Sequence, residues 1–370
     1  MAKKTLFLTF RIFSVMGGIE RVCRIFGKAL YEMHEHAAKD IQVYSMYDEA
    51  ADIDERYFPA LIFRGFGIQK RRFIIDSIRQ GIKSDIVIIS HVNLLPVAFC
   101  IKLFSPKTKL VLLAHGIEVW KKFGFVKRLM LKQFNVILAV SNFTRSKMIA
   151  LNGLPESKFI VLNNCLDPYL PIPVPGGKDP ALMKKYGFGE DDIILMTITR
   201  LSSKEKYKNC DRVLATMQAL TATYPQLKYL LVGACDDDER ARIEKMSEAF
   251  GVRQSVIITG FIPDSTIPAY YNLADIFIML SEREGFGIVF IEAMYYGKPV
   301  IGANRGGVTD ALVDGAFGIL VEPTDIGNVS AGIKNIVADK SRYVPERSAV
   351  LSYFGYPVYK EKLQHILNAL

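Results

Sequence analysis

The sequence predicts an α/β protein made of two Rossmann-like, doubly wound domains, and three observations predict this. The chain has 370 residues, which is too long for one ordinary hydrophobic core. Short apolar runs alternate with helical segments through both halves, a pattern typical of parallel sheets covered by helices. A cluster of breaker residues separates the two halves: Pro168, Pro171, Pro173, Pro175, Gly176, Gly177 and Pro180. We therefore predict a first domain over residues 1–170, a linker over 171–190, a second domain over 191–350 and a final helical segment over 351–370.

The composition is that of a globular protein. Half of the residues are hydrophobic and 23% are charged. No secretory signal is evident before the strand-like run at residues 5–10, so we expect a cytoplasmic protein. The longest apolar region, residues 86–104, contains polar residues and a proline and therefore predicts a strand and a helix rather than a membrane span. The five cysteines have no paired spacing, which fits a reducing compartment and predicts no zinc site.

The excess positive charge is confined to the first half of the chain. Residues 1–170 hold 25 Lys and Arg against 14 Asp and Glu, whereas residues 171–370 hold 22 against 24. Three basic clusters (Lys70-Arg71-Arg72, Lys121-Lys122 and Lys127-Arg128) alternate with apolar side chains: Phe66, Phe73, Trp120, Phe123, Phe125 and Leu129. This pattern predicts docking on an anionic membrane surface, with a solvated basic face as the alternative. No nucleic-acid recognition motif is present, so we expect no nucleic acid as a partner.

The first domain opens with a strand over residues 5–10, two glycines at Gly17 and Gly18, and a helix to about Glu35. A strand, glycines and a helix are typical of dinucleotide-binding folds, but the Gly-x-Gly-x-x-Gly fingerprint is missing. That absence disfavours a nicotinamide oxidoreductase. Further strands are predicted at 41–44, 86–90, 110–114, 136–140 and 159–162. Ligands of such sheets bind at the carboxyl ends of strands, and His115 follows one of these ends.

The second domain repeats the alternation. A strand over 193–199 ends at Arg200, and Lys208 follows in the loop. Two cations at such a place can neutralise a diphosphate, and Lys206 is a second candidate for the lysine's role. Further strands are predicted at 229–232, 256–259, 274–280 and 300–302. The acidic run at 236–239 is interpreted as a solvated loop and helix N-terminus rather than a metal site.

Residues 281–299 form the most informative stretch of the chain. A loop with two glycines leads into a helix predicted over 288–296, which Gly297 and Pro299 then stop. Free backbone N–H groups and the positive end of the helix dipole suit a phosphate at this loop. Glu284 and Glu292 flank the loop, and carboxylates beside an anion site are suited to bind sugar hydroxyls. Two solvated glutamates are the alternative.

These residues resemble the Glu-x7-Glu signature of retaining glycosyltransferases of family 4, through Glu-Gly-Phe-Gly and the following Glu-Ala-Met-x-x-Gly-x-Pro-Val. The Gly-Gly-x-Glu-Arg that begins at Gly17, the Ala-His-Gly-x-Glu around His115 and the paired cations of the second domain resemble the same family. The resemblance implies the GT-B fold, in which two Rossmann-like domains face a central cleft and a terminal helix returns to the first domain. The sequence departs from the family pattern at Cys165 and Asn209, where glycine is usual, and at Thr309-Asp310, where Pro-Glu is usual.

The resemblance also implies an activity: transfer of a sugar from a UDP- or GDP-linked donor to an acceptor hydroxyl, with retention at the anomeric carbon. The acceptor would be a glycan or a lipid-linked molecule, in cell-surface polysaccharide or glycolipid biosynthesis. Catalytic roles are implied for four residues: His115, Arg200, Lys208 and Glu284. Substrate-binding roles are implied for nine more: Gly17, Gly18, Ile262, Gly285, Phe286, Gly287, Ile288, Val289 and Glu292.

No cofactor and no divalent metal are expected, because paired cations would neutralise the leaving diphosphate. No carboxylate is a clear nucleophile, which favours a same-face displacement over a covalent intermediate. Two other functions stay open on this fold, a nucleotide-sugar epimerase and a non-catalytic binding subunit. We expect the protein in the cytoplasm, where the basic half would attach it peripherally to the inner face of the membrane.

Overall fold

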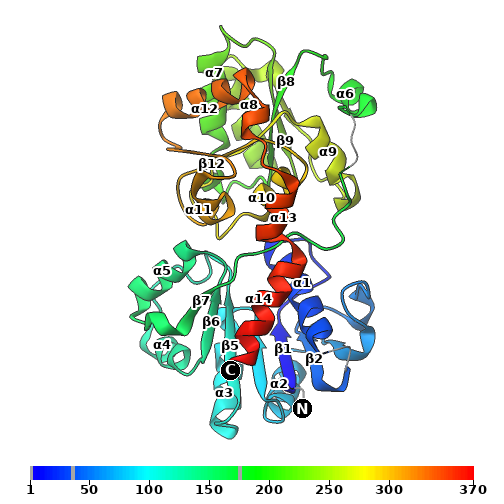
Figure 1. Cartoon of the computed structure of the whole chain (residues 1–370), viewed down its shortest axis with the longest axis vertical. Helices are drawn as coiled ribbons and strands as arrows, with labels where there is room; N and C mark the ends of the chain where they lie inside the picture. The colour runs from blue at the N-terminus through cyan, green and yellow to red at the C-terminus, as the bar shows by residue number, and fades with distance from the viewer. Residues whose placement is uncertain (1–2, 35–37, 174–176) are drawn as a thin grey trace. The chain divides into compact units, whose positions relative to one another are not determined.

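The computed structural model describes residues 3–34, 38–173 and 177–370. Glu35, at the predicted end of the first helix, and Pro175 and Gly176 of the predicted linker lie outside these residues. The chain divides into two compact units. Unit 1 comprises Met1–Pro168 together with Gly355–Leu370, and unit 2 comprises Tyr169–Phe354. Each unit contains its own parallel sheet (Figure 1), as the predicted fold class requires.

Unit 1 contains a seven-stranded sheet in the order β3-β2-β1-β4-β5-β6-β7, and all paired strands are parallel. Its strands are β1 Thr5–Thr9, β2 Ile41–Ser45, β3 Phe63–Gly65, β4 Ile86–Ile89, β5 Lys109–Ala114, β6 Val136–Ala139 and β7 Phe159–Val161. Its helices are α1 Gly18–Met33, α2 Lys70–Gly81, α3 Leu95–Phe104, α4 Phe125–Lys132, α5 Asn142–Asn152 and α14 Tyr356–Asn368. The short edge strand β3 was not predicted, because three residues carry too little periodicity to stand out.

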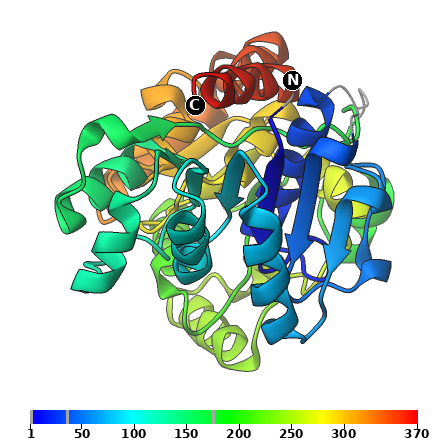
Figure 2. The ribbon, with the colours of Figure 1, turned by 90° about the horizontal axis from the view of Figure 1, so that it is seen from below.

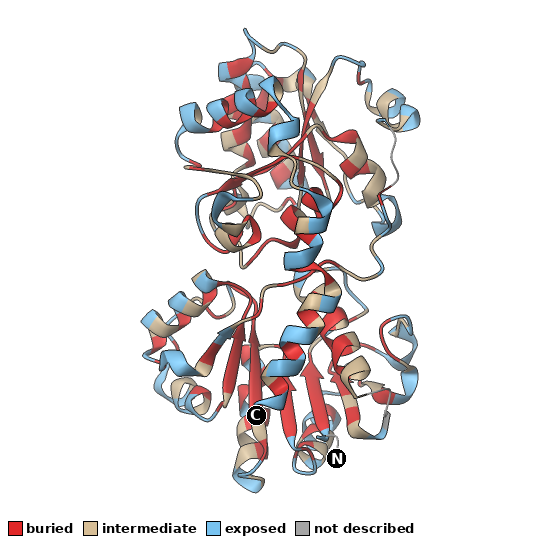
Figure 3. Cartoon of the chain, viewed as in Figure 1, coloured by how far each residue is buried: buried red, intermediate tan, exposed pale blue. Residues whose placement is uncertain are grey.

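Side chains of unit 1 alternate between the two faces of its sheet, as the period of two along a strand requires. Leu6 and Leu8 of β1 pack with α2, α3 and α4, whereas Phe7 packs with α1 and α14. Figure 2 shows this layering, with the red α14 and the cyan α3 on opposite sides of the sheet. The inner strands β1, β4, β5 and β6 are buried on both faces (Figure 3), which explains their continuous apolar sequences.

Unit 2 contains a six-stranded parallel sheet in the order β10-β9-β8-β11-β12-β13. Its strands are β8 Ile193–Ile198, β9 Leu227–Val232, β10 Val256–Ile258, β11 Ile276–Met279, β12 Val300–Ala303 and β13 Ile319–Val321. Its helices are α6 Pro180–Tyr186, α7 Cys210–Leu220, α8 Asp237–Ala249, α9 Ile267–Leu273, α10 Ile288–Tyr295, α11 Val308–Ala311, α12 Ile326–Ala338 and α13 Arg347–Phe354. The predicted strands of this unit lie within about two residues of the observed ones at both ends, the usual uncertainty of element boundaries.

Two parts of the predicted domain layout differ from the structure. The segment predicted as a linker contains α6, which begins at Pro180 after the side chain of Asp179 caps its first turn. The final segment is two helices rather than one. Gly355 and the proline that follows Tyr356 interrupt it, so α13 belongs to unit 2 and α14 to unit 1. In unit 1, Tyr359, Leu363 and Leu367 of α14 join the core that contains α1. Within the described residues, no helix has the length and apolar character needed to span a membrane.

Candidate functional site

Both sheets have a switch point at which the strand order reverses direction. In unit 2 the chain goes from β8 outward to β9 and β10, then returns to place β11 on the other side of β8. In unit 1, β1 lies between β2 and β4 in the same manner. The crevice at the carboxyl ends of such a strand pair is the usual ligand site of an open α/β sheet. The residues predicted from the sequence follow these strands.

The loop after β11 forms the centre of the arrangement in unit 2. Gly287 caps α10 with φ of 91°, and a Cβ atom there would lie 2.5 Å from the ring of Phe290. The neighbouring Gly307 is equally constrained, because a Cβ atom would lie 2.0 Å from the carbonyl oxygen of Gly285. The N–H of Gly307 donates to the carbonyl of Glu284 at 2.8 Å. These glycines let the loop pack tightly beside the start of α10, where the N–H of Phe290 donates to the carbonyl of Gly287 at 3.1 Å and the first N–H groups of a helix have no partner within it.

Glu284 and Lys208 form an ion pair across the switch point. Lys208 Nζ lies 2.8 Å from Glu284 Oε2, and the two side chains are only 15% and 19% exposed. Burial opposes the charge on Lys208, but the adjacent Glu284 carboxylate outweighs it, so the pKa of the lysine is raised. The pair therefore keeps a positive and a negative group together at the carboxyl ends of β8 and β11.

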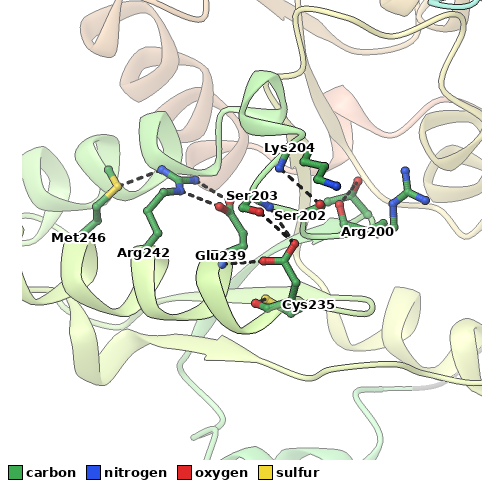
Figure 4. A network of polar contacts seen from close by, with 10 residues as sticks. Arg200, Ser202, Ser203, Lys204, Cys235, Glu239, Arg242 and Met246 are labelled. Atoms are coloured by element: carbon green, nitrogen blue, oxygen red, sulfur yellow. Dashed lines mark hydrogen bonds and ion pairs between the residues drawn. The ribbon is translucent and has the colours of Figure 1, made fainter.

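The predicted second cation, Arg200, follows β8 and is 72% exposed. Its guanidinium forms an ion pair with Glu205 of the same loop. Figure 4 shows Arg200 beside the segment of Ser202, Ser203 and Lys204. The guanidinium itself is exposed, whereas Glu205 is only 18% exposed, so the cation remains accessible to a phosphate from the solvent side.

The two candidate lysines differ in their surroundings. Lys206 and Lys208 lie in one short 3₁₀ turn, η6 Lys206–Lys208, but only Lys208 points to Glu284 while Lys206 is exposed. Asn209, at the position where the family has glycine, adopts φ of 56° and donates from Nδ2 to the carbonyl of Leu280 at 2.9 Å. Asparagine tolerates this left-handed conformation, so the departure keeps the backbone shape and adds a link to the loop after β11.

Glu292 lies inside α10 rather than on an open surface. Its side chain is 2% exposed, and Oε2 accepts a hydrogen bond from the hydroxyl of Tyr271 at 2.9 Å. Tyr296 stacks on Tyr271 with ring centroids 5.0 Å apart, which fixes the donor. Neither tyrosine was singled out in the sequence, because each lies on a helix face whose partner is set by the fold.

Most of the remaining residues predicted in unit 2 lie in the loop after β11 or in the first turn of α10. Phe286 is buried and packs edge-on against Phe354, with ring centroids 5.8 Å apart. Ile288 is buried in the first turn of α10, whereas Val289 is half-buried. Ile262 follows β10 and is half-buried, two strands away from β8 in the sheet. The structure thus brings the residues of the loop after β11 together and places Ile262 further along the same edge.

The acidic run at 236–239 corrects one expectation. Asp236 caps α8, and its Oδ1 accepts from the N–H of Glu239 at 2.8 Å. Glu239 is 3% exposed and pairs with Arg242 at 2.6 Å (Figure 4), so it is a buried ion pair and not a solvated group. Among the residues the structure describes, no group of three or more His, Cys, Asp and Glu side chains is arranged to hold a metal ion.

In unit 1 the predicted glycines begin α1 after β1. Gly17 is the N-cap in an extended conformation, and a Cβ atom there would lie 2.2 Å from Oε2 of Glu20. Gly18 has open space on its Cβ side. The carboxylate of Glu20 therefore lies against the backbone of the first turn of α1, where the helix dipole favours a negative charge.

A buried carboxylate that the sequence analysis missed holds the loop before these glycines. Asp48 is 0% exposed and accepts hydrogen bonds from the backbone N–H groups of Ile12 at 2.6 Å and of Ser14 at 2.9 Å. The hydroxyl of Ser45 donates to it at 2.7 Å, and that of Ser14 donates to it as well. No motif marks Asp48, because its partners lie on another strand and in another loop. Its charge is compensated by N–H and O–H donors, and it fixes the path from β1 to Gly17.

His115 follows β5 and is 9% exposed. Its Nε2 lies 3.0 Å from the carbonyl oxygen of Ser90, so Nε2 carries the proton and donates. Burial lowers the pKa of this histidine, although Glu118 opposes the shift. Nδ1 is buried and has no hydrogen-bond partner among the described residues. The neutral ring therefore presents a lone pair, and Glu118 shapes the turn by accepting from the N–H groups of His115 and Gly116.

Comparison with known proteins shows that both halves of the chain match families of glycosyltransferases. Residues 16–169 match the family described as Glycosyltransferase Family 4, and residues 178–355 match Glycosyl transferases group 1. The chain belongs to the glycosyltransferases of the GT-B fold. Together the two family matches cover most residues of this glycosyltransferase.

Individual relatives are distant. A GDP-mannose-dependent alpha-(1-6)-phosphatidylinositol monomannoside mannosyltransferase of Mycolicibacterium smegmatis is 27% identical over 258 residues, which is 67% of this chain and 64% of that protein. A D-inositol 3-phosphate glycosyltransferase of Geodermatophilus obscurus is 26% identical over 51% of this chain and 45% of that protein. The glycosyltransferase thus matches about half to two thirds of the length of these curated relatives.

Solved structures share the fold over the whole length. The structure of Anabaena HepE in complex with UDP has a TM-score of 0.80 at 19% identity, and the match covers 99% of this chain and 100% of that one. The sucrose-phosphate synthase of Thermosynechococcus elongatus has a TM-score of 0.75 at 17% identity, with 99% of both chains covered. At these identities the similarity establishes the fold of the glycosyltransferase alone.

The prediction that the basic clusters and the apolar residues between them form one docking surface is partly wrong for this glycosyltransferase. Phe66, Phe73 and Phe123 are buried in the core of unit 1, and Trp120 packs against that core while its Nε1 donates to the hydroxyl of Thr144. Of the predicted apolar residues, only Phe125 and Leu129 are exposed. Sequence spacing could not separate them, because the burial of each helix or loop side chain depends on tertiary packing.

Proposed function

We propose that this protein transfers a sugar from a nucleotide diphosphate donor to an acceptor hydroxyl with retention at the anomeric carbon, as retaining enzymes of family 4 with a Glu-x7-Glu motif do. The observation that carries the proposal is the ion pair of Lys208 and Glu284 at the switch point of unit 2, beside the N-terminus of α10. A cation and backbone N–H groups suit a phosphate, and a carboxylate beside them suits a sugar hydroxyl.

The donor side of the proposal rests on unit 2. Arg200 and Lys208 would contact the diphosphate, and the N–H groups from Gly285 to Val289 would face the sugar and the distal phosphate. Glu292 would meet the ribose hydroxyls. HepE has been solved in complex with UDP and with UDP-glucose, and the mycobacterial relative is named as GDP-mannose-dependent. These names support a nucleotide diphosphate sugar as the donor. Its base and its sugar have to be identified by experiment.

The chemistry would need no covalent intermediate. The bond between the anomeric carbon and the phosphate oxygen breaks, and a bond from the same carbon to the acceptor oxygen forms on the same face. The acceptor proton moves to the departing phosphate oxygen. The protein contributes positioning and electrostatic stabilisation, with Lys208 next to the leaving group and Glu284 near the sugar ring. His115 would offer its Nδ1 lone pair to a substrate hydroxyl.

The acceptor would be lipid-linked or otherwise near a membrane, and the enzyme would attach peripherally to the inner face of that membrane. Two observations support this part: the basic excess of the first half and the phosphatidylinositol monomannoside in the name of a relative. Cell-surface polysaccharide or glycolipid biosynthesis would supply such an acceptor.

The test is a panel of UDP- and GDP-linked sugars, scored first by thermal stabilisation, because a ligand that binds the native state raises its stability. The stabilising donor is then incubated with acceptor glycans and lipids, and NMR identifies the anomer of the product. We expect one donor to stabilise the protein and to give a product with the donor's anomeric configuration. An inverted product would overturn retention, and an epimerised donor without transfer would overturn glycosyl transfer.

A further inference from the structure

One helical layer of unit 1 carries almost all of its excess charge. Residues 70–132, which build α2, α3 and α4, hold 13 Lys and Arg against three Asp and Glu, whereas the rest of residues 1–170 hold 12 against 11. In this layer α2 packs against α3 and α3 against α4, all on one face of the sheet. Eight of these 13 Lys and Arg lie on the three helices, and the other five lie in the loops and the strand that connect them.

The same layer exposes large hydrophobic side chains. They are Ile68, Ile74, Ile75 and Ile82 on or beside α2, Leu103 and Phe104 at the end of α3, and Phe125, Val126 and Leu129 on α4. Ile68 is 88% exposed, Phe104 70% and Phe125 74%. Among the described residues of unit 2, five large hydrophobic side chains are exposed: Tyr169, Ile172, Phe261, Leu351 and Tyr353. Apolar side chains gathered on one face among charges mark an interaction surface.

The three acidic residues of residues 70–132 offset only a small part of this charge. Asp76 forms an ion pair with Arg64 at 2.8 Å and longer ones, at 3.8 Å, with Arg72 and Arg79 of α2, and Asp85 accepts from the backbone N–H of Lys4. Glu118 accepts from two backbone N–H groups of its own turn. Several lysines of the layer are by contrast exposed: Lys83, Lys107, Lys121, Lys122 and Lys132.

We propose that the outer surface of the α2–α3–α4 layer docks on an anionic lipid bilayer. The isoleucines and phenylalanines would enter the headgroup region while the cations face lipid phosphates, as the apolar and basic faces of interfacial helices do. A second copy of this chain is a poorer occupant, because two such faces would bring like charges together. Nucleic acid would engage the cations and leave the apolar side chains in water. The inference goes beyond the proposed transfer, since it names the surface and the lipid chemistry that would hold the enzyme near its acceptor.

The first experiment uses the full chain with vesicles of phosphatidylcholine, alone or mixed with phosphatidylglycerol, in co-sedimentation at low and at high salt. We expect binding to the anionic vesicles only, weakened at high salt because ions screen exposed charges beyond about 8 Å at physiological ionic strength. Equal binding to both vesicle types, or none to either, would overturn the proposal.

The second experiment locates the surface. Replacing Lys107, Lys121, Lys122 and Lys132 by glutamine should weaken binding to anionic vesicles by about 10²- to 10³-fold. The matched control replaces four exposed lysines of unit 2 by glutamine, Lys184, Lys185, Lys245 and Lys334, and should leave binding unchanged. Equal losses in both variants would show that net charge, and not this face, drives binding, and would overturn the proposal.

The apolar contribution has its own pair of variants. I68Q together with F125Q should weaken binding at a given salt concentration, whereas I172Q together with L351Q in unit 2 should not. All four side chains are exposed, so each variant should keep the thermal unfolding of the native chain. Sedimentation velocity completes the design: a dimer that the lysine variant abolishes while vesicle binding persists would make a second copy the occupant. Thermal stabilisation by the donor is measured on every variant, so that loss of docking and failure of the proposed reaction are told apart.

Discussion

The two units share a fold and a type of ligand edge, but they place their charges in opposite ways. Unit 2 concentrates ionic groups at its switch point, where Lys208 pairs with Glu284 and Arg200 with Glu205. Unit 1 has glycines and a neutral histidine at the corresponding edge and carries its cations on an outer helical layer. The fold therefore determines where a site lies, and the side chains at that edge determine what it can bind.

The comparison extends to one carboxylate in each unit. In unit 2, Glu284 is compensated by a lysine, so the charge it offers a ligand depends on a partner that a ligand can displace. In unit 1, Asp48 is compensated by backbone N–H groups and hydroxyls, and all of them belong to the fold. The first arrangement suits a group that exchanges partners during a reaction, and the second suits a group that holds a loop still.

The largest effect is expected from removing the charge of Glu284, which pairs with Lys208 in unit 2. E284Q keeps the shape of the side chain but loses its charge, and we expect turnover to fall by about 10²-fold or more, the scale of removing one preorganised electrostatic group. The measurement is initial rate with the stabilising donor, alongside thermal unfolding to confirm that the variant folds. E322Q, which changes an exposed glutamate paired with Arg305 in the same unit, is the control. Native turnover in E284Q would remove Glu284 from the site.

The second prediction tests whether buried charge makes the stability of unit 2 depend on pH. Burial lowers the pKa of Lys298 from 10.5 to about 8, with Lys340 and Lys178 acting in the same direction and Asp275 opposing it. Between pH 8 and 10.5 the unfolded chain binds more protons, so stability should rise with pH, by up to roughly 3 kcal/mol for this lysine. K298M should flatten that rise in thermal unfolding, while K334M, at an exposed lysine, should not. A rise of the same size in K298M would assign the dependence to other groups.

The third prediction concerns the loop that Asp48 holds in unit 1. D48N removes the charge that binds the backbone of Ile12 and Ser14, and we expect the KM for the acceptor to rise about 10-fold, the scale of a lost charged hydrogen bond. Stabilisation by the donor nucleotide should be unchanged, because that site is proposed for unit 2. D52N is the control, since Asp52 caps an exposed turn nearby. If D48N weakened donor binding and acceptor use equally, Asp48 would be a general stability residue.

The sequence predicted what depends on local patterns. Glu284, its glycines and α10 lie in one continuous stretch, so the strand, loop and helix were predicted within about two residues. Asp48 could not be predicted, because Ile12 and Ser14 are brought to it only when β1 and β2 pair. The membrane surface shows the same limit. Phe73 was grouped with the basic cluster, yet it is fully buried and its neighbours Ile74 and Ile75 are the exposed residues.

For the last prediction we expect no effect: removing divalent metal ions should leave the rate of sugar transfer unchanged. Arg200, Lys208 and the N-terminus of α10 already supply positive charge at the proposed diphosphate site, so the leaving group would be stabilised without a metal ion. Transfer should therefore proceed at an unchanged rate after exhaustive chelation with EDTA. The charge-deleted K208M should lose activity under the same conditions, which shows that the assay detects a loss of leaving-group stabilisation. Activity that disappears on chelation and returns with manganese or magnesium would assign this role to a metal. It would then be wrong that the ionic groups at the switch point of unit 2 suffice for it, which is the main difference between the two units.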